Sequence, residues 1–323
     1  MDYPRITVVI VSYNFERYIA ECIESVLAQT LSPYEIIIAD DHSTDRSWEI
    51  IKRYQSKYPN LIKAYRNEKN LGPAKNANRF WKLFNGDYHS IIDGDDRWLP
   101  RKLETEWRAL QKDPEAQIAY SNVYLIDTEG KRIGILYNGQ GSEPPTGDVF
   151  VEVFSKRFFP NTNDRSVFRN ELVTRYAYLQ EGLCDENLIN HWDWDRKIRY
   201  TARFKVTYSG EPLVEYRRHD KGVSNMSPEK RYQSILSVYK KNLPLLSLRT
   251  EEEIKIIKKE IKDLLFSILP IRLDNFNKLS FESSRHSDAI SINRKGEELF
   301  LKGYLKESLD PVSYTHLTLP TKA

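Results

Sequence analysis

The stretch Arg5-Ile-Thr-Val-Val-Ile-Val11 decides the fold that this sequence predicts. It is a continuous β-branched run, which is typical of a strand buried on both faces of a parallel sheet. An amphipathic helix is predicted after it, because Ile19, Cys22 and Val26 recur at helical spacing. Repeated strand–helix units follow as far as residue 100. They predict parallel strands joined by right-handed crossovers, and hence a Rossmann-like α/β fold whose mostly parallel sheet is flanked by helices.

The other predicted elements become less regular along the chain. In the first hundred residues, strands are predicted at 35–39, 61–65 and 88–92, and helices around 48–54 and from Pro73. Beyond them we predict a helix at 101–112, a strand at 116–124, an exposed loop at 139–147, short strands at 203–208 and 213–216, and a helix at 251–268.

Three segments are expected in the domain organisation. Residues 1–225 form the α/β domain, and residues 226–310 form a charged helical region. Residues 311–323 continue no earlier pattern and resemble a translated adapter-derived tail, so we expect them to be non-native and the native C-terminus to be missing. The helical region supports the fold, forms a homodimer or lies against a membrane surface, and the sequence leaves these alternatives open.

Composition excludes several classes of protein. A net charge of +3 is too small to indicate a nucleic-acid partner. Only two cysteines occur, and Cys22 falls on the apolar face of a predicted helix, so a disulfide framework is not expected and a reducing compartment is favoured. No run approaches the ~18 apolar residues that span a bilayer, and no signal peptide is recognised. We therefore expect a cytoplasmic protein, with the inner face of the membrane as an alternative.

A cluster of carboxylates marks the end of the strand predicted at 88–92. Asp93, Asp95 and Asp96 lie within four residues, and such close carboxylates repel one another unless a cation sits among them. Oxygen ligands suit Mg²⁺ or Mn²⁺, which bind one or two carboxylates together with the phosphates of a substrate. At the carboxyl end of a central strand, this cluster predicts a metal–diphosphate site. A solvated acidic turn is the alternative.

Two other segments should converge on the same edge of the sheet. Ser12, Tyr13 and Asn14 follow the first strand, where a helix N-terminus would offer N–H groups to an anion and the tyrosine a face to a base. Their alternative role is helix N-capping. Asp41 follows the second strand and could accept a hydrogen bond from a nucleobase or ribose, the alternative being a turn.

A glycine-containing loop is the third such segment. In Asn70-Leu-Gly72-Pro-Ala-Lys-Asn76, the glycine permits close backbone approach, and the helix that starts there can face a phosphate. Taken with the acidic cluster, these segments are far more specific than any one of them alone.

The chain resembles the family 2 glycosyltransferases, which have the GT-A fold of nucleotide-diphospho-sugar transferases. The resemblance covers roughly residues 4–225. It is carried by the motifs Val-Val-Ile-Val-Ser-Tyr-Asn14, Ser25-Val-Leu-Ala-Gln-Thr30, Glu35-Ile-Ile-Ile-Ala-Asp-Asp-His-Ser-Thr-Asp45, Asn70-Leu-Gly72 with Asn76, Asp93-Gly-Asp-Asp96, Asp193-Trp-Asp-Arg-Lys-Ile-Arg199 and Tyr216-Arg-Arg-His219 through Ser224.

The resemblance implies roles for the residues of the donor site. Tyr13 would stack on the nucleobase, and Asp41 would accept its imide N–H. Asp93 would contact the ribose, and Asp95 would bind Mg²⁺ or Mn²⁺, with the neighbouring Asp96 as a further candidate. The metal would bridge the two phosphates and stabilise the leaving nucleoside diphosphate.

His219 matches the position at which enzymes with this fold often supply an imidazole to the metal or diphosphate. Its alternative role is that of a surface histidine in a basic turn, beside Arg217 and Arg218.

A general base is implied near residue 193. The family usually shows Glu-Asp there, whereas this chain has Trp192-Asp193, so Asp193 matches the second residue. Asp195 is the competing candidate, its alternative role being an ion pair with Arg199 at i+4 on a helix. Less favoured carboxylates precede them, namely Asp185 and Glu186.

The resemblance thus implies an inverting glycosyltransferase of the hexosyltransferase type. It would move a sugar from a nucleotide-diphosphate donor, most simply a UDP-sugar, to a hydroxyl of a glycan or lipid-linked acceptor. Such activity belongs to bacterial polysaccharide biosynthesis at the cell envelope. Two alternatives stay open, a nucleotidyltransferase and a non-catalytic module that binds a nucleotide or a glycan on the same fold.

Overall fold

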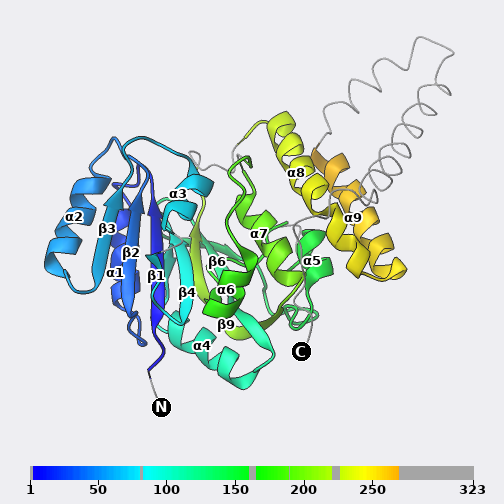
Figure 1. The fold of residues 1–323 in the computed structure, drawn as a ribbon, viewed down its shortest axis with the longest axis horizontal. Coiled ribbons are helices and arrows are strands. Elements are labelled where there is room, and N and C mark those ends of the chain that lie inside the picture. Colours follow the sequence, from blue (N-terminus) through cyan, green and yellow to red (C-terminus); the bar gives the residue numbers. More distant parts are fainter. Residues whose placement is uncertain (1–2, 81–82, 160–164, 189, 220–225, 269–323) are drawn as a thin grey trace, which may run out of the picture. The chain divides into compact units, whose positions relative to one another are not determined.

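A computed structural model describes most of the chain (Figure 1). The described residues are 3–80, 83–159, 165–188, 190–219 and 226–268. Two compact units meet between Met226 and Ser227 along the sequence. The segments that lie outside the described residues include the predicted tail at 311–323, the part of the predicted helical region at 269–310, and residues 220–224 of the resemblance.

The first unit alternates strands and helices along its N-terminal half and then becomes less regular. Its elements are β1 (Ile6–Ser12), α1 (Ile19–Leu27), β2 (Glu35–Asp40), α2 (Ser47–Lys57), β3 (Ile62–Arg66), α3 (Pro73–Phe80), β4 (Tyr88–Asp93), β5 (Arg97–Trp98), α4 (Lys102–Lys112), β6 (Ala116–Ile126), β7 (Arg132–Ile135), α5 (Phe150–Phe154), β8 (Leu172–Thr174), α6 (Arg175–Glu181), α7 (Trp192–Thr201) and β9 (Lys205–Arg217).

Nine strands of the described chain form one sheet, in the order β3-β2-β1-β4-β8-β6-β9-β5 with β7 beside β6. The predicted α/β fold is confirmed, and β3, β2, β1 and β4 are parallel as predicted. Beyond β4 the sheet is mixed, since β8 runs antiparallel to both β4 and β6 whereas β6 and β9 are parallel. The prediction of a mostly parallel sheet therefore describes the N-terminal half only.

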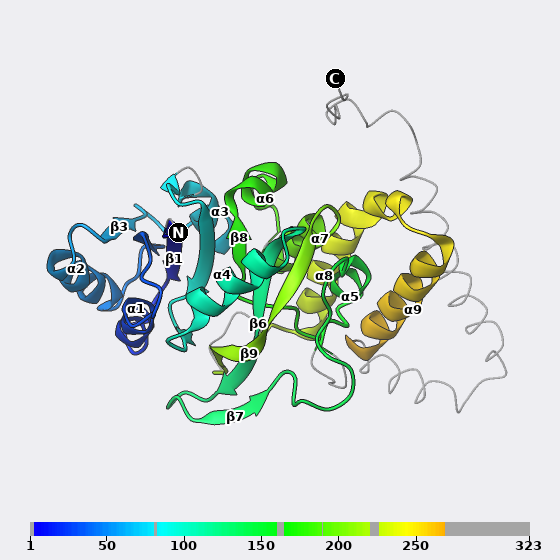
Figure 2. The ribbon, with the colours of Figure 1, turned by 90° about the horizontal axis from the view of Figure 1, so that it is seen from below.

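The order of the parallel strands fixes where a ligand can bind. From β1 the chain moves outward to β2 and β3, and then returns across β1 to form β4. Right-handed crossovers place α1 and α2 on one face of the sheet and α3 on the other, which is the arrangement in Figure 2. The direction reverses between β1 and β4, and open α/β sheets bind their ligands in the crevice at the carboxyl ends of the strands there.

Burial explains why these strands are central. In β1, Ile6, Val8 and Ile10 are fully buried, and all six residues of β2 are buried. On α1 the predicted apolar stripe is buried as well, including Cys22. The core thus lies against both faces of the parallel strands, as the β-branched run predicts.

The prediction of two strands near the end of the first unit is wrong. Two short strands were expected at 203–208 and 213–216, but the chain forms a single strand, β9, across both. The intervening Gly210 has φ +83°, and the register with β6 shifts nearby, so a bulge carries the strand past the residues that read as a break. This strand places Arg217 beside the turn formed by residues 93–96, the acidic turn.

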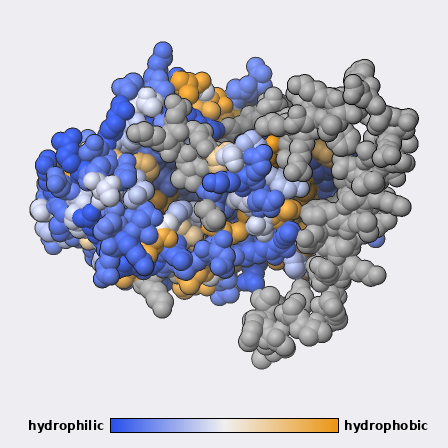
Figure 3. Space-filling model, turned by 90° about the horizontal axis from the view of Figure 1, so that it is seen from above, coloured by the Kyte–Doolittle hydropathy of each residue, from blue (hydrophilic) through white to orange (hydrophobic). Residues whose placement is uncertain are grey.

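The second unit is helical over its described residues. It contains α8 (Pro228–Asn242), a 3₁₀-helix (Leu243–Leu248) and α9 (Glu251–Ile268), which confirms the helix predicted at 251–268. The apolar stripe of α9, including Ile257, Ile261 and Leu264, is buried. No helix in the described ranges is long and apolar enough to cross a membrane. Among the coloured residues in Figure 3, hydrophilic ones predominate and the apolar ones form small groups.

Candidate functional site

The ends of three parallel strands gather the predicted donor-site residues at one edge of the sheet. In the β-sheet register, Ser12 pairs with Asp40 and Val11 pairs with Asp93. The three strands therefore end within one residue of the same level. The residues that the resemblance assigns to the donor leave the sheet at the point where the strand order reverses.

The loop after β1 differs from the prediction. A helix N-terminus was expected at Asn14, but α1 begins only at Ile19, so this loop does not cap a helix. Asn14 instead has φ +57°, and its side chain accepts a hydrogen bond from the Thr44 N–H at 2.8 Å. Its own N–H donates to Ser43 Oγ at 2.9 Å. These contacts tie the loop after β1 to the loop after β2. Asparagine suits this position because it tolerates the left-handed conformation.

The side chains of this loop lie in contrasting environments. Tyr13 is 42% exposed, which leaves a ring face open to a base. Ser12 is buried, and no described residue hydrogen-bonds to its hydroxyl oxygen. The structure thus offers an open aromatic face beside the carboxyl end of β1.

Asp41 is buried and already holds the glycine-containing loop. One carboxylate oxygen accepts from the Leu71 N–H at 2.8 Å and from Asn67 Nδ2 at 2.7 Å, and the other accepts from the Gly72 N–H at 2.8 Å. A carboxylate has about four acceptor positions. Three of them are used within the protein, so the first effect of Asp41 is to fix the loop that precedes α3.

Gly72 and Asn76 shape the start of α3. Gly72 has φ +84°, a conformation that L side chains rarely adopt, and the space where a Cβ would lie is open. Asn76 is buried, donates to the Ala39 carbonyl at 3.2 Å and accepts from Asn67 Nδ2 at 2.9 Å. The predicted helix start at Pro73 is confirmed, and the glycine beside it leaves room for a ligand.

The acidic turn brings together two residues that lie 124 positions apart. His219 Nε2 lies 2.9 Å from Asp95 Oδ2, and both side chains are largely buried. Burial and the charge of Asp95 raise the pKa of Asp93 to about 6. Burial and the same charge also raise the pKa of Asp96 well above its ordinary value. Carboxylates held this close destabilise one another when ionised, and a cation would remove that penalty.

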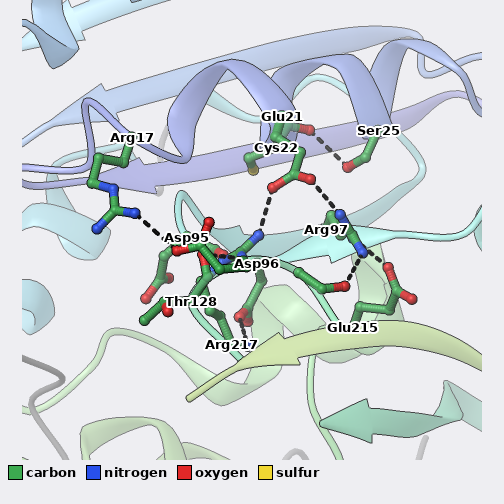
Figure 4. A network of polar contacts seen from close by, with 12 residues as sticks. Arg17, Glu21, Cys22, Ser25, Asp95, Asp96, Arg97, Thr128, Glu215 and Arg217 are labelled. Atoms are coloured by element: carbon green, nitrogen blue, oxygen red, sulfur yellow. Dashed lines mark hydrogen bonds and ion pairs between the residues drawn. The ribbon is translucent and has the colours of Figure 1, made fainter. Parts of the chain in front are cut away.

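Arg217 fastens the acidic turn to the end of β9 (Figure 4). Its backbone N–H donates to Asp96 Oδ1 at 2.9 Å, and its Nε donates to the Asp95 carbonyl at 2.8 Å. Its other nitrogens reach the Thr128 carbonyl at 3.2 Å and Glu21 Oε2 at 2.5 Å. The side chain is 2% exposed. A planar guanidinium with several donors can satisfy all these acceptors at once, which a lysine cannot.

The same network extends to α1 and to Glu215 near the end of β9. Arg97 forms ion pairs with Glu21 and with Glu215, and donates to the Gly130 carbonyl at 2.8 Å (Figure 4). Arg132 binds the other oxygen of Glu215 at 2.7 Å. Two arginines and two glutamates therefore link α1, β5, β7 and β9 around the acidic turn.

The donor set suits a divalent cation that also binds the ligand. Within the described residues, no three His, Cys, Asp or Glu side chains are arranged to hold a metal ion by themselves. Asp95 and His219 offer one carboxylate and one imidazole, and Asp96 Oδ2 is buried with no hydrogen-bond partner among the described residues. Mg²⁺ takes one or two protein carboxylates and completes its shell with water and substrate phosphates. The residues present fit such an ion.

The two candidate bases lie in the first turn of α7 in very different surroundings. The Asp193 side chain is 46% exposed and lies 3.6 Å from Lys197 Nζ. The Asp195 side chain has no exposed surface, and Arg199 binds it at 3.1 Å. Asp195 is therefore in the ion pair that the sequence offered as its alternative role. Trp194 is also in the core, where its Nε1 donates to the Val153 carbonyl at 2.8 Å.

The less favoured carboxylates, Asp185 and Glu186, each accept a hydrogen bond within the protein. Asp185 Oδ1 accepts from the Asn187 N–H at 3.0 Å and so closes its own turn. Glu186 accepts from Asn78 Nδ2 at 3.0 Å. These contacts are structural, and neither residue gains an argument as a base.

Sequence reasoning missed a cation beside the acidic turn. Arg169 Nη1 lies 3.9 Å from Asp93 Oδ2, and its guanidinium lies 3.7 Å from the ring centroid of Tyr216. Burial opposes its charge, but Tyr216 and the surrounding carboxylates raise the pKa of Arg169 overall. No motif of the sequence marks this residue, whereas Arg217 lies two positions before His219 and was named only as a basic neighbour.

Known proteins are similar to this chain in sequence. The sequence profile of glycosyl transferase family 2 matches residues 7–168. An uncharacterized glycosyltransferase of Methanocaldococcus jannaschii is 31% identical over 237 residues, which are 72% of this chain and 78% of that protein.

Solved structures share the fold at low sequence identity. S. aureus TarS 1–349 in complex with UDP superposes with a TM-score of 0.58 and 18% identity, covering 80% of this chain and 70% of that one. The mannosyltransferase PcManGT from Pyrobaculum calidifontis, in complex with GDP-Man and Mn²⁺, gives a TM-score of 0.59 and 15% identity over 95% of this chain and 84% of that one. With the GT-A fold of these enzymes and a profile match over half its length, the chain belongs to glycosyltransferase family 2.

Proposed function

We propose that this enzyme transfers a sugar with inversion from a UDP-sugar, or another nucleotide-diphosphate donor, to a hydroxyl of a glycan or lipid-linked acceptor. The observation that carries the proposal is the contact between Asp95 and His219 at 2.9 Å, beside Asp93 at the carboxyl end of β4. This contact joins the two residues that the family resemblance assigns to the metal and the diphosphate. The complexes of TarS with UDP and of PcManGT with GDP-Man and Mn²⁺ support a nucleotide donor.

In this proposal, the donor lies across the carboxyl ends of β1, β2 and β4. Tyr13, whose ring is open to solvent, stacks on the nucleobase, and Asp93 contacts the ribose. Gly72 lets the donor approach the backbone at the start of α3. Asp41 contributes mainly by holding that loop, and its remaining acceptor position can take the imide N–H of the base.

Asp95 and His219 would hold Mg²⁺ or Mn²⁺, with Asp96 as a further ligand. When bound, such an ion would supply positive charge that stabilises the leaving nucleoside diphosphate. Arg217 keeps the acidic turn in place from below, through the carbonyl of Asp95 and the carboxylate of Asp96.

Asp193 would take the proton of the acceptor hydroxyl as that oxygen attacks the anomeric carbon. Partial desolvation tends to raise the pKa of Asp193, but the positive charges of Lys197, Arg169, Lys156 and His191 bring that pKa below its ordinary value, so the carboxylate is ionised at neutral pH. Its half-exposed position allows a hydroxyl to reach it. Positioned general bases typically contribute ~10²–10⁴-fold to a rate.

The test is calorimetric titration of UDP into the full chain with and without Mn²⁺, for the wild type and for Asp95→Asn. We expect metal-dependent binding that is lost in the variant. Asp87→Asn is the matched control, because Asp87 lies just before β4 at its opposite end and its carboxylate forms an exposed ion pair with Arg5. It should bind as the wild type does.

Transfer is then measured with a panel of nucleotide sugars for Asp193→Asn and Asp195→Asn. We expect Asp193→Asn to lower turnover and spare UDP binding. If Asp195→Asn alone behaves in this way, the base is Asp195. Donor binding with no transfer or hydrolysis by the wild type would instead indicate the non-catalytic module.

A further inference from the structure

Lys197 lies buried between two carboxylates of the proposed acceptor side. Its Nζ is 3.6 Å from Asp193 Oδ2 and 3.7 Å from Glu171 Oε2, and its side chain is 8% exposed. Lysine is almost never so deeply buried unless it is paired. Its position one turn after Asp193 on α7 brings the two side chains onto the same face of the helix.

Glu171 fixes the other end of this bridge to the central sheet. It directly precedes β8, the strand between β4 and β6, and its side chain is 6% exposed. The preceding carbonyl, that of Asn170, accepts a hydrogen bond from Ser90 Oγ of β4 at 2.7 Å and another from the buried Lys102. The backbone beside Glu171 is therefore held by Ser90 and Lys102, and Lys197 connects α7 to the Glu171 carboxylate.

A second ion pair on the same helix provides a comparison. Asp195 and Arg199 have the same i,i+4 spacing as Asp193 and Lys197, and each pair has one deeply buried member, Asp195 in the first and Lys197 in the second. The Asp195 carboxylate has no exposed surface, whereas the Asp193 carboxylate is 46% exposed. A pair that only stabilises the helix requires no open carboxylate. The Lys197 pair leaves its carboxylate accessible while its cation is anchored underneath.

We propose that Lys197 is a positioning residue, which ties the Asp193 carboxylate to Glu171 and so holds it in one orientation towards the acceptor hydroxyl. This inference rests on the proposed function, since it gives the proposed base its geometry. A misplacement of about 1 Å in a reacting group can cost roughly 10²-fold in rate. Lys197 itself touches neither donor nor acceptor in this scheme.

The charges around Asp193 make the proposal sharply testable. The charged groups that influence it include Lys197 on α7, Arg169 before β8, Lys156 after α5, His191 before α7 and the carboxylate of Asp93. Removing Lys197 takes away the largest of the influences that lower the pKa of Asp193, so the carboxylate becomes more basic. A more basic carboxylate that remains ionised accepts protons more readily. A purely electrostatic role thus predicts a faster variant, and a positioning role predicts a slower one.

The experiment measures kcat and the donor KM of the full chain for Lys197→Met, Lys197→Arg and Arg199→Met. We expect Lys197→Met to lower kcat by about 10- to 100-fold, with the donor KM and the UDP affinity unchanged. Lys197→Arg should restore most of the loss, because it keeps the cation between the two carboxylates. Arg199→Met is the matched control on the same helix. It should not show a lowered kcat at unchanged donor KM.

A double-mutant cycle separates this role from a loss of stability. In the Asp193→Asn background, Lys197→Met should cost no further activity, because the residue acts through the carboxylate that is already removed. Unchanged or increased kcat in Lys197→Met, or a full loss in both backgrounds, would overturn the proposal. Lys197→Gln replaces Lys197→Met if the latter does not fold.

Failure of the proposed function has a different signature. It would appear as a wild type that transfers no sugar, or as full activity in Asp193→Asn. Failure of the inference alone would appear as an active wild type and an inactive Asp193→Asn, together with an unimpaired Lys197→Met.

Discussion

Replacing Arg217 by methionine tests how the acidic turn is held. The arginine joins the end of β9 to the Asp95 carbonyl at 2.8 Å, to the carbonyls of Asp127 and Thr128, and to Glu21. Methionine resembles the apolar stem of the arginine side chain, but it has no hydrogen-bond donors. The variant therefore removes the contacts of the guanidinium while it keeps the packing of the side-chain stem.

The expected loss of stability follows from these contacts. Removing one partner of a buried ion pair costs about 3–5 kcal/mol, mainly because the other charge is left buried and unpaired. Here the partner Glu21 is 43% exposed and also forms an ion pair with Arg97, so its charge is not stranded. The expected cost therefore lies below that range, at about 1–3 kcal/mol in the free energy of unfolding, which is the cost of leaving the carbonyl acceptors of Arg217 unpaired.

The variant should also impair the donor site. Residues that orient a metal ligand typically contribute 10–100-fold to metal affinity. Arg217 holds the backbone of Asp95 and the carboxylate of Asp96, so Arg217→Met should weaken Mn²⁺-dependent binding of UDP by roughly that factor. Urea unfolding and calorimetry on the same preparation measure both effects.

Arg132→Met is the control within the same network. Arg132 also binds Glu215, but its side chain is 47% exposed, so its loss should cost below about 1 kcal/mol and leave UDP binding unchanged. The reasoning is refuted if Arg217→Met loses less than about 1 kcal/mol, or if it binds UDP with Mn²⁺ as tightly as the wild type does.

Two further predictions concern buried charges beneath the site. Burial, and then the charges of Arg196 and Lys102, lower the pKa of His89 well below 6.5, so below that pH the unfolded chain binds a proton that the folded chain does not. Stability should fall by up to about 1.4 kcal/mol per pH unit on acidification, and urea midpoints measured on both sides of pH 6.5 should differ less in His89→Phe than in the wild type. Lys102 and Glu106 form a fully buried ion pair at 2.9 Å, so Lys102→Met should cost about 3–5 kcal/mol in the free energy of unfolding. The double variant Lys102→Met/Glu106→Gln should recover part of that loss. A cost below about 1 kcal/mol for the single variant in urea unfolding would contradict this expectation.

Local sequence patterns predicted the elements that repeat. The β-branched run at 5–11, the apolar stripe of α1 and the proline at the start of α3 each depend on neighbours a few residues away. Such signals also located the acidic turn, because a strand that ends in carboxylates is visible in the chain itself. The error at 203–216 came from the same dependence, since a glycine and a proline read as a break although a bulge in β9 accommodates them.

The sequence by itself determined the parallel half of the sheet, the family and the residues that gather at the carboxyl ends of β1, β2 and β4. Only the tertiary structure decided how those residues are held. Asp95 contacts His219, which lies 124 positions away in the sequence. Asp41 uses most of its acceptor positions to hold the loop at Gly72, and Lys197 lies between Asp193 and Glu171. Periodicity encodes which face of an element is buried, whereas pairings between distant side chains depend on how strands and helices pack, which no local pattern specifies.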